Sequence, residues 1–189
     1  VTCAESSGSD DDDDEAWTVT DLGNVGSIAL DLQAEHIYWT SYRSGTISRC
    51  DLSGGNREVV CAGLSTWGPY GMTLDVPASK MYWVESGIGK VMQADLSGAN
   101  KLEVVGGLDA PSGIALAEGD PKLLYWTEAN CIRRVDLGSR QVETLVTGLA
   151  QPYMLALDVI AGKMYWTNTK GTTIERATLS GGGRETVLS

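Results

Sequence analysis

The sequence is poor in several residues on which common functions depend. Phenylalanine is absent, and histidine occurs once, as His36. A chain with one histidine and four scattered cysteines is a poor candidate for a zinc site or for histidine-based catalysis, so we expect no metal, no cofactor and no catalytic residue. No apolar run approaches the roughly 18 residues that a membrane-spanning helix needs. The sequence therefore predicts no membrane span.

Basic residues are also scarce, with 14 Lys and Arg against 25 Asp and Glu and a formal net charge of −11. This balance argues against nucleic acid as a partner, because phosphate binding needs a basic surface. Six of the acidic residues form one run at 10–15, and the remaining surface is only mildly acidic. The run lacks the alternating ligands and central glycine of an EF-hand loop, which favours solvated acid over weak calcium binding.

The most informative feature is an internal repeat built on the dipeptide Tyr-Trp. Its four tryptophans are spaced 44, 43 and 40 residues apart: Trp39, Trp83, Trp126 and Trp166. A short apolar strand precedes each dipeptide, and a third β-pattern, a glycine-rich turn and a fourth strand follow it. The period, the alternation and the turns predict an all-β chain of four-stranded propeller blades with the tryptophans in the core.

The Tyr-Trp-Thr sequence in the second strand, together with Asp-Leu-Ser-Gly after the third, resembles the YWTD β-propeller family, the class B repeats of the LDL receptor and its relatives. The chain departs from the family where an aspartate usually closes the motif. The four residues at that place are Ser41, Glu85, Glu128 and Asn168. The resemblance implies an extracellular or cell-surface protein of six blades that binds other proteins through one loop face.

The repeat also predicts how the chain is divided. We expect four complete blades over 23–189 and, over 1–22, an N-terminal half-blade whose hairpin loop is the acidic run 10–15. A disordered acidic tail is the alternative for the first residues. Six blades at this period need roughly 250 residues, so we expect an open arc whose ends are completed by another chain or by residues outside this sequence.

The loops that enter the first strand and leave the second strand of each blade hold the candidate partner-binding residues. They are Tyr42, Arg43, Trp67, Tyr70, Glu85, Glu128, Tyr153 and Lys170. Exposed Trp, Tyr and Arg are common interface anchors. The alternative is that three of them, Trp67, Tyr70 and Tyr153, only cap the core between blades.

The four cysteines fit an oxidising compartment. If the hairpin of the first full blade turns at Gly55-Asn56, Cys50 and Cys61 lie opposite each other, and we expect a disulfide between them. Two blades separate Cys3 from Cys131. We therefore expect each of these to be free, or to form a bond with a segment outside this sequence or with a neighbouring subunit.

Taken together, these features predict a non-enzymatic extracellular module for protein interaction or assembly. In one version the chain is part of a receptor ectodomain that binds a protein ligand on its loop face. In another it is a structural subunit whose open ends self-associate into a ring or filament. A propeller hydrolase is the remaining alternative, although no nucleophile motif is recognisable.

Overall fold

The computed structural model describes residues 22–189, which form sixteen β-strands and one short 3₁₀ turn, η1 (Ser86–Ile88). The strands make four separate antiparallel sheets of four strands each, and in every sheet the spatial order follows the chain order. The predicted all-β propeller of four four-stranded blades is therefore confirmed. The predicted half-blade, its acidic loop and Cys3 lie outside the described residues.

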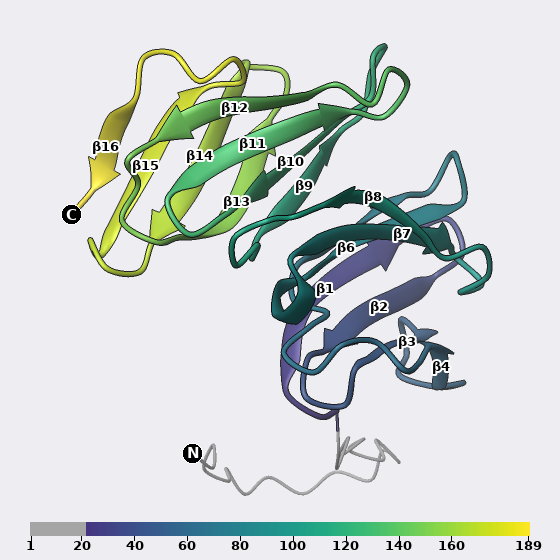
Figure 1. Ribbon diagram of the computed structural model, residues 1–189. Coiled ribbons are helices and arrows are strands. Elements are labelled where there is room, and N and C mark those ends of the chain that lie inside the picture. The colour runs from purple at the N-terminus through teal and green to yellow at the C-terminus, as the bar shows by residue number, and fades with distance from the viewer. Residues whose placement is uncertain (1–21) are drawn as a thin grey trace, which may run out of the picture.

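Each blade is one sheet (Figure 1). Blade 1 consists of β1 (Val25–Asp31), β2 (His36–Ser41), β3 (Thr46–Asp51) and β4 (Glu58–Cys61). Blade 2 consists of β5 (Met72–Asp75), β6 (Lys80–Glu85), β7 (Lys90–Asp95) and β8 (Leu102–Gly106). Blade 3 consists of β9 (Ile114–Ala117), β10 (Leu123–Thr127), β11 (Cys131–Asp136) and β12 (Val142–Thr147). Blade 4 consists of β13 (Pro152–Asp158), β14 (Lys163–Asn168), β15 (Thr173–Thr178) and β16 (Glu185–Leu188).

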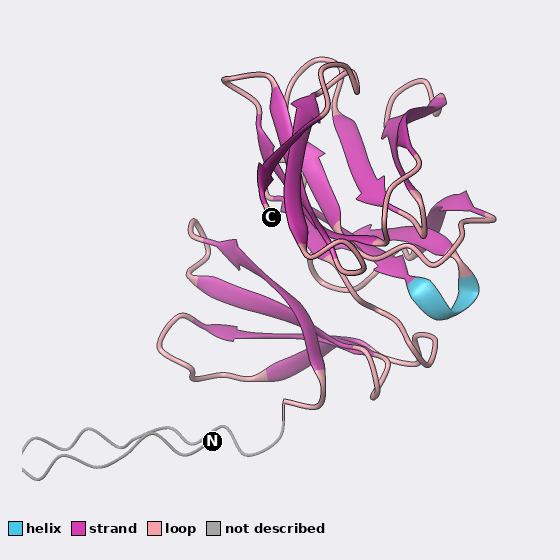
Figure 2. Cartoon of the chain, turned by 90° about the vertical axis from the view of Figure 1, so that its left-hand side faces the viewer, coloured by secondary structure: helices cyan, strands magenta, loops and turns pink. Residues whose placement is uncertain are grey.

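The first strands of the blades lie innermost. Contacts join β1 to β5, β5 to β9 and β9 to β13, so the blades succeed one another in chain order. Figure 2 shows the sheets as separate fans of strands, with η1 as the helical turn among the described residues. Within these residues no helix has the length and apolar character needed to cross a membrane.

The core lies between successive blades and follows from the Tyr-Trp dipeptide. Neighbouring residues of a strand point to opposite faces of the sheet. Each tryptophan therefore faces the preceding blade, and each tyrosine faces the following one. The three buried clusters pair Tyr38 with Trp83, Tyr82 with Trp126, and Tyr125 with Trp166.

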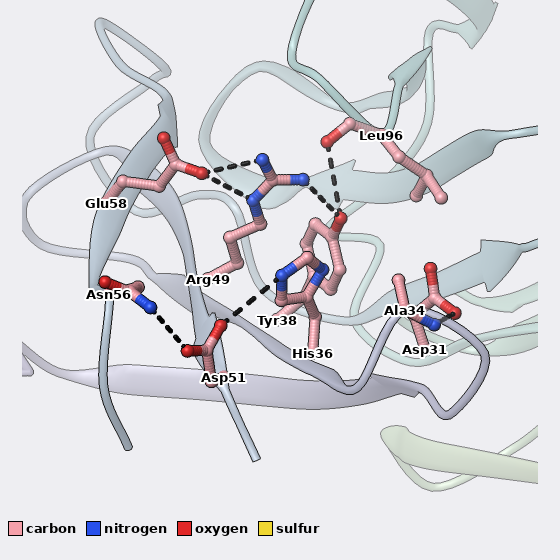
Figure 3. Close-up of polar contacts among 9 residues, drawn as sticks. All are labelled: Asp31, Ala34, His36, Tyr38, Arg49, Asp51, Asn56, Glu58 and Leu96. Carbon is pink, nitrogen blue, oxygen red and sulfur yellow. Dashed lines mark hydrogen bonds and ion pairs between the residues drawn. The ribbon is translucent and has the colours of Figure 1, made fainter. Parts of the chain in front are cut away.

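A carboxylate closes the first hairpin of three blades. The Asp31 Oδ1 atom accepts a hydrogen bond from the Ala34 amide at 3.0 Å, as Figure 3 shows. Equivalent bonds join Ala78 to Asp75 and Ala161 to Asp158. These aspartates stabilise tight turns by satisfying amides that the strand ladder leaves unpaired.

The hairpin between the third and fourth strands differs from the one expected. The chain turns early in blade 1, where the Asp51 amide donates to the Gly55 carbonyl at 2.9 Å. A bulge follows, and Cys61 then lies opposite Ile47 instead of Cys50. The predicted register is wrong, and Cys50 and Cys61 are both free thiols. An irregularity recurs at the same place in all four blades, so it belongs to the repeat.

We expect the thiols to differ in reactivity. Burial raises the pKa of both thiols, but the Cys61 side chain is only 2 % exposed, whereas Cys50 lies at a partly open surface. At neutral pH, alkylation of the native chain should label Cys50 first and Cys61 only on unfolding. Peptide mapping of the unreduced chain measures this, and recovery of a peptide cross-linked through Cys50 and Cys61 would contradict the observed register.

Candidate functional site

Three of the predicted partner-binding residues come together on the loop face. Tyr42 follows β2, Tyr70 precedes β5, and Tyr153 lies in β13, so the three side chains come from three blades. The rings of Tyr42 and Tyr70 stack with centroids 4.8 Å apart, and Tyr153 meets Tyr70 edge-on at 6.2 Å. We call these three residues the tyrosine cluster. All three side chains are partly exposed, so the cluster is open to solvent.

The threonine of the Tyr-Trp-Thr motif holds the next tyrosine of this cluster in place. The Thr40 hydroxyl donates to the Tyr70 carbonyl at 2.6 Å, and the Thr127 hydroxyl donates to the Tyr153 carbonyl at 2.8 Å. Each bond joins the second strand of one blade to the start of the first strand in the next. The cluster is therefore fixed by backbone anchors on rigid strands.

The tyrosine cluster has a distinct electrostatic environment. Burial raises the pKa of Tyr153, and the neighbouring Tyr70 and Tyr42 add to this shift. The Tyr153 phenol therefore stays neutral over the physiological range and can both donate and accept hydrogen bonds. A hollow of about 290 Å³ adjoins Tyr153 and is lined by Ser112, Gln151 and Thr169 among others. This surface combines aromatic area with polar groups.

Trp67 projects from the loop that leads into Tyr70 and is 62 % exposed. Its φ is +69°, a value that bulky residues rarely adopt. Arg43 and Lys170 are also exposed, on loops that follow the second strands of blades 1 and 4. The structure thus leaves Trp67, Arg43 and Lys170 accessible, as a binding surface requires, although no ring contact within 22–189 joins Trp67 to the tyrosine cluster.

Glu85 and Glu128 lie beneath this surface instead of on it, with 3 % and 5 % exposure. Each carboxylate accepts a hydrogen bond from the indole of its own motif, Trp83 at 3.1 Å and Trp126 at 2.8 Å. The second oxygen of each accepts a hydrogen bond from an amide of the loop that leads from the preceding blade into the first strand of the glutamate's own blade. These amides are Ser65 N at 2.9 Å and Asp109 N at 3.0 Å. The two glutamates are positioning residues that fix the loops, including the loop carrying Trp67.

In blade 4 the carboxylate that lies beside the tryptophan comes from a different strand of the sheet. Glu175 of β15 lies opposite Trp166 in the strand register and is 8 % exposed. Arg184 donates to both of its oxygens at 3.1 Å. Burial opposes the charged form of Glu175, but the hydrogen bonds from Arg184 and Asn168 outweigh it, so the pKa lies below its ordinary value.

The sequence did not suggest two functional features. One is the pair of threonine anchors, which are the hydroxyls of Thr40 and Thr127 on the tyrosine carbonyls. The other is the pair of glutamate clamps, in which Glu85 and Glu128 each bind an indole and a loop amide. In the sequence, Glu85 and Glu128 stand directly after the Tyr-Trp repeat, at the place where an aspartate is expected. This replacement was the available signal for the two clamps. Their burial depends on how the loop from the preceding blade folds back. Within residues 22–189 no three His, Cys, Asp or Glu side chains are placed to hold a metal ion.

Comparison with known proteins defines the class of fold. No protein-family model matches the chain. Among solved structures, the chain is similar to one of a nidogen/laminin complex, with a TM-score of 0.80 and 22 % identity over 87 % of this chain and 65 % of that one. It is also similar to a gluconolactonase from Xanthomonas campestris, with a TM-score of 0.75 and 16 % identity over 87 % of this chain and 62 % of that one.

A putative TolB from Agrobacterium tumefaciens is similar as well, with a TM-score of 0.72 and 14 % identity over 87 % of this chain and 62 % of that one. At such identities the similarity shows the β-propeller fold and nothing about activity. The chain spans 62–65 % of the length of these three structures.

The glutamate clamp can be tested by substitution at Glu128. Glu128→Ala leaves the buried Trp126 indole and the Asp109 amide without their acceptor and removes the ion pair with Arg133, and it should lower the free energy of unfolding by about 2–4 kcal/mol. Glu128→Gln keeps an acceptor and should cost about 1 kcal/mol. Chemical denaturation measures both. Equal losses for the two variants would mean that the carboxylate does not act as an acceptor for these groups.

The Glu175–Arg184 pair predicts a pH dependence. Because the folded-state pKa of Glu175 is lowered, the carboxylate stabilises the fold above its ordinary pKa of about 4.3, and this stability is lost as pH falls through the lowered folded value. Arg184→Met should cost about 1–2 kcal/mol at pH 7, and the difference from the unsubstituted chain should shrink towards pH 3. A difference that is independent of pH would contradict this assignment.

Proposed function

We propose that the chain is a non-enzymatic extracellular module that binds a protein partner through its loop face. The observation that carries this proposal is the tyrosine cluster, which gathers Tyr42, Tyr70 and Tyr153 from three blades at one surface. Tyrosine supplies a large apolar ring and a hydroxyl with few rotatable bonds, and it is enriched among residues that dominate binding energy. Trp67, Arg43 and Lys170 extend the surface with further anchors of the same kind.

The rigidity of the cluster supports this function. Side chains that are already held in place lose little conformational freedom on binding. The anchors from Thr40 and Thr127 hold the backbone of Tyr70 and Tyr153, and the ring contacts hold their side chains against each other. A hydrogen bond from Ser65 to Glu85 fixes the loop that carries Trp67. A preorganised aromatic surface of this kind suits a folded protein partner.

The comparisons agree with a binding role but do not name a partner. The nidogen structure is of a complex with laminin, which is a property of that protein. The resemblance to YWTD propellers supports an extracellular or cell-surface location. In one form of this function, the chain is part of a receptor ectodomain that binds a protein ligand.

A second form, an assembly subunit, is favoured by the two end faces of the arc, which no other blade within residues 22–189 covers. On blade 1, Ile28 and Leu52 are 64 % and 44 % exposed, and they border a hollow of about 310 Å³ that also reaches Trp39. On blade 4, Met154 and Leu188 are 41 % and 62 % exposed. Apolar sheet faces of this kind are usually covered in soluble proteins. Another chain would cover them.

The loop-face proposal can be tested by capture from an extract of extracellular-matrix proteins that includes laminin. Tyr42→Ala and Tyr153→Ala together should lower capture of the proteins that the unsubstituted chain retains by about tenfold or more, because loss of an interface anchor costs at least about 2 kcal/mol. Ile160→Ser, at a fully exposed position on another loop, is the control. If the double variant is folded and captures the same proteins equally well, the loop face is not the binding site.

A further inference from the structure

A row of three side chains across β2, β3 and β4 reaches from blade 1 to blade 2 (Figure 3). Arg49 Nε donates to Glu58 Oε1 at 2.7 Å, and Arg49 Nη1 donates to the Tyr38 hydroxyl at 3.0 Å. The Tyr38 hydroxyl in turn donates to the Leu96 carbonyl of blade 2 at 3.5 Å. We call such a row a Tyr-Arg-Glu triad.

The same triad joins blades 3 and 4. Tyr125, Arg134 and Glu143 occupy the equivalent positions in the register of β10, β11 and β12. Arg134 donates to Glu143 at 2.7 Å, and both Arg134 and Tyr125 donate to the Leu179 carbonyl of blade 4, at 3.1 and 3.3 Å. The contact therefore repeats with a new pair of blades.

The acceptor in both cases is a Leu-Ser-Gly turn that follows the third strand. These turns are 96–98 and 179–181, and their glycines have φ values of +83° and +89°. A Cβ atom at Gly98 would lie 2.0 Å from the Val60 carbonyl, and one at Gly181 would lie 2.2 Å from the Leu145 carbonyl. Only glycine allows the turn to approach the fourth strand of the preceding blade so closely.

The triad and the turn occur together inside the arc. Between blades 2 and 3 both are missing, since Gln93 and Leu102 stand in the Arg and Glu positions of blade 2. The corresponding turn of blade 3 reads Leu137-Gly138-Ser139. Thus the two interfaces with a triad have a Leu-Ser-Gly turn, and the interface without a triad has none.

One triad and one turn are left without a counterpart within residues 22–189. Tyr165, Arg176 and Glu185 of blade 4 have the register of the other triads, and Arg176 donates to Glu185 at 2.7 Å. Tyr165 is partly exposed, whereas Tyr38 and Tyr125 are 1 % and 0 % exposed, because no described blade covers it.

The unmatched turn is 52–54 in blade 1. Gly54 has a φ of +88°, in line with the matched turns, yet a Cβ atom built there would meet nothing within 4 Å among residues 22–189. The Leu52 side chain is 44 % exposed. Blade 1 therefore presents a Leu-Ser-Gly turn with the backbone conformation of the matched turns, and no described blade lies opposite it.

We propose that the Tyr165-Arg176-Glu185 triad of one chain docks on the Leu52-Ser53-Gly54 turn of a second copy. The proposal rests on the assembly form of the proposed function and names its contact. Tyr165 and Arg176 would donate to the Leu52 carbonyl, and Gly54 would approach the backbone at the bulge of β16. The Tyr165 ring would enter the hollow lined by Ile37 and Trp39, as Tyr38 packs against Met81 and Trp83.

Complementarity favours a second copy over residues 1–21 of the same chain. Those residues contain no Tyr, Arg or Lys, so they lack the donors that the turn accepts in the two internal contacts. The innermost strands follow one another from β1 to β13, which places the unmatched turn and the unmatched triad at opposite ends of the arc. The contact is therefore head-to-tail, and each added copy leaves one turn and one triad free.

Sedimentation velocity of the full chain over a range of concentrations tests this contact. The unsubstituted chain should form species larger than its 20.1 kDa monomer as concentration rises. Arg176→Gln, Tyr165→Phe and Leu52→Asp should each weaken association by about tenfold or more, because each removes a donor or places an unpaired carboxylate in the contact. Arg43→Gln, the same change on the loop face, should associate like the unsubstituted chain.

Mixing two variants distinguishes a head-to-tail contact from a symmetric one. Arg176→Gln keeps an intact turn, and Leu52→Asp keeps an intact triad, so an equimolar mixture should form dimers that do not grow further. A chain that stays monomeric at every concentration, variants that associate normally, or a mixture that stays monomeric would each overturn the proposal. The capture experiment is repeated with Arg176→Gln, whose loop face is intact. Capture and self-association are thus measured separately, and failure of one proposal can be distinguished from failure of the other.

Discussion

The structure depends on one local constraint, which is that adjacent residues of a strand point to opposite faces of the sheet. The Tyr-Trp dipeptide uses this constraint to give each blade two different faces, one with an indole and one with a phenol. Stacking the blades then brings the phenol of each blade against the indole of the next, as with Tyr82 and Trp126. A blade with this design buries its aromatic side chains only between two neighbours, so the arc is held together by repetition of one interface.

The closing acid of the repeat is where the blades differ from one another. In blades 2 and 3 a glutamate accepts the indole of its own blade and an amide of the loop between blades. Blade 4 instead places Glu175 next to Trp166 from the neighbouring strand. In blade 1 the Ser41 hydroxyl donates to the Leu22 carbonyl, and the indole nitrogen of Trp39 is buried without a hydrogen-bond partner among residues 22–189. The indole nitrogen of Trp166 in blade 4 is likewise buried without a hydrogen-bond partner among these residues, so the two terminal blades share this feature.

The scaffold has two kinds of surface with different physical character. The loop face collects aromatic rings that are anchored through their backbones, which suits recognition of a different protein. The end faces present the same apolar and polar groups that join blades inside the arc, which suits recognition of another blade. The triads also give a role to the Arg and Glu pairs in the outer hairpins of blades 1 and 3. The pair orients the guanidinium towards the tyrosine hydroxyl, and Arg134 also reaches the Leu179 carbonyl of blade 4.

Much of the architecture could be predicted from the sequence, because the period of the Tyr-Trp repeat and the alternation within each strand are local properties of the chain. They were sufficient for the number of blades, the positions of the strands and the burial of all four tryptophans. Only the tertiary structure decided the register of the outer hairpins, where an early turn and a bulge separate Cys50 from Cys61. It also decided that Glu85 and Glu128 lie under the loops, and that Tyr42, Tyr70 and Tyr153 meet. These outcomes depend on contacts between blades, which bring together residues far apart in the chain and therefore leave no local pattern in its sequence.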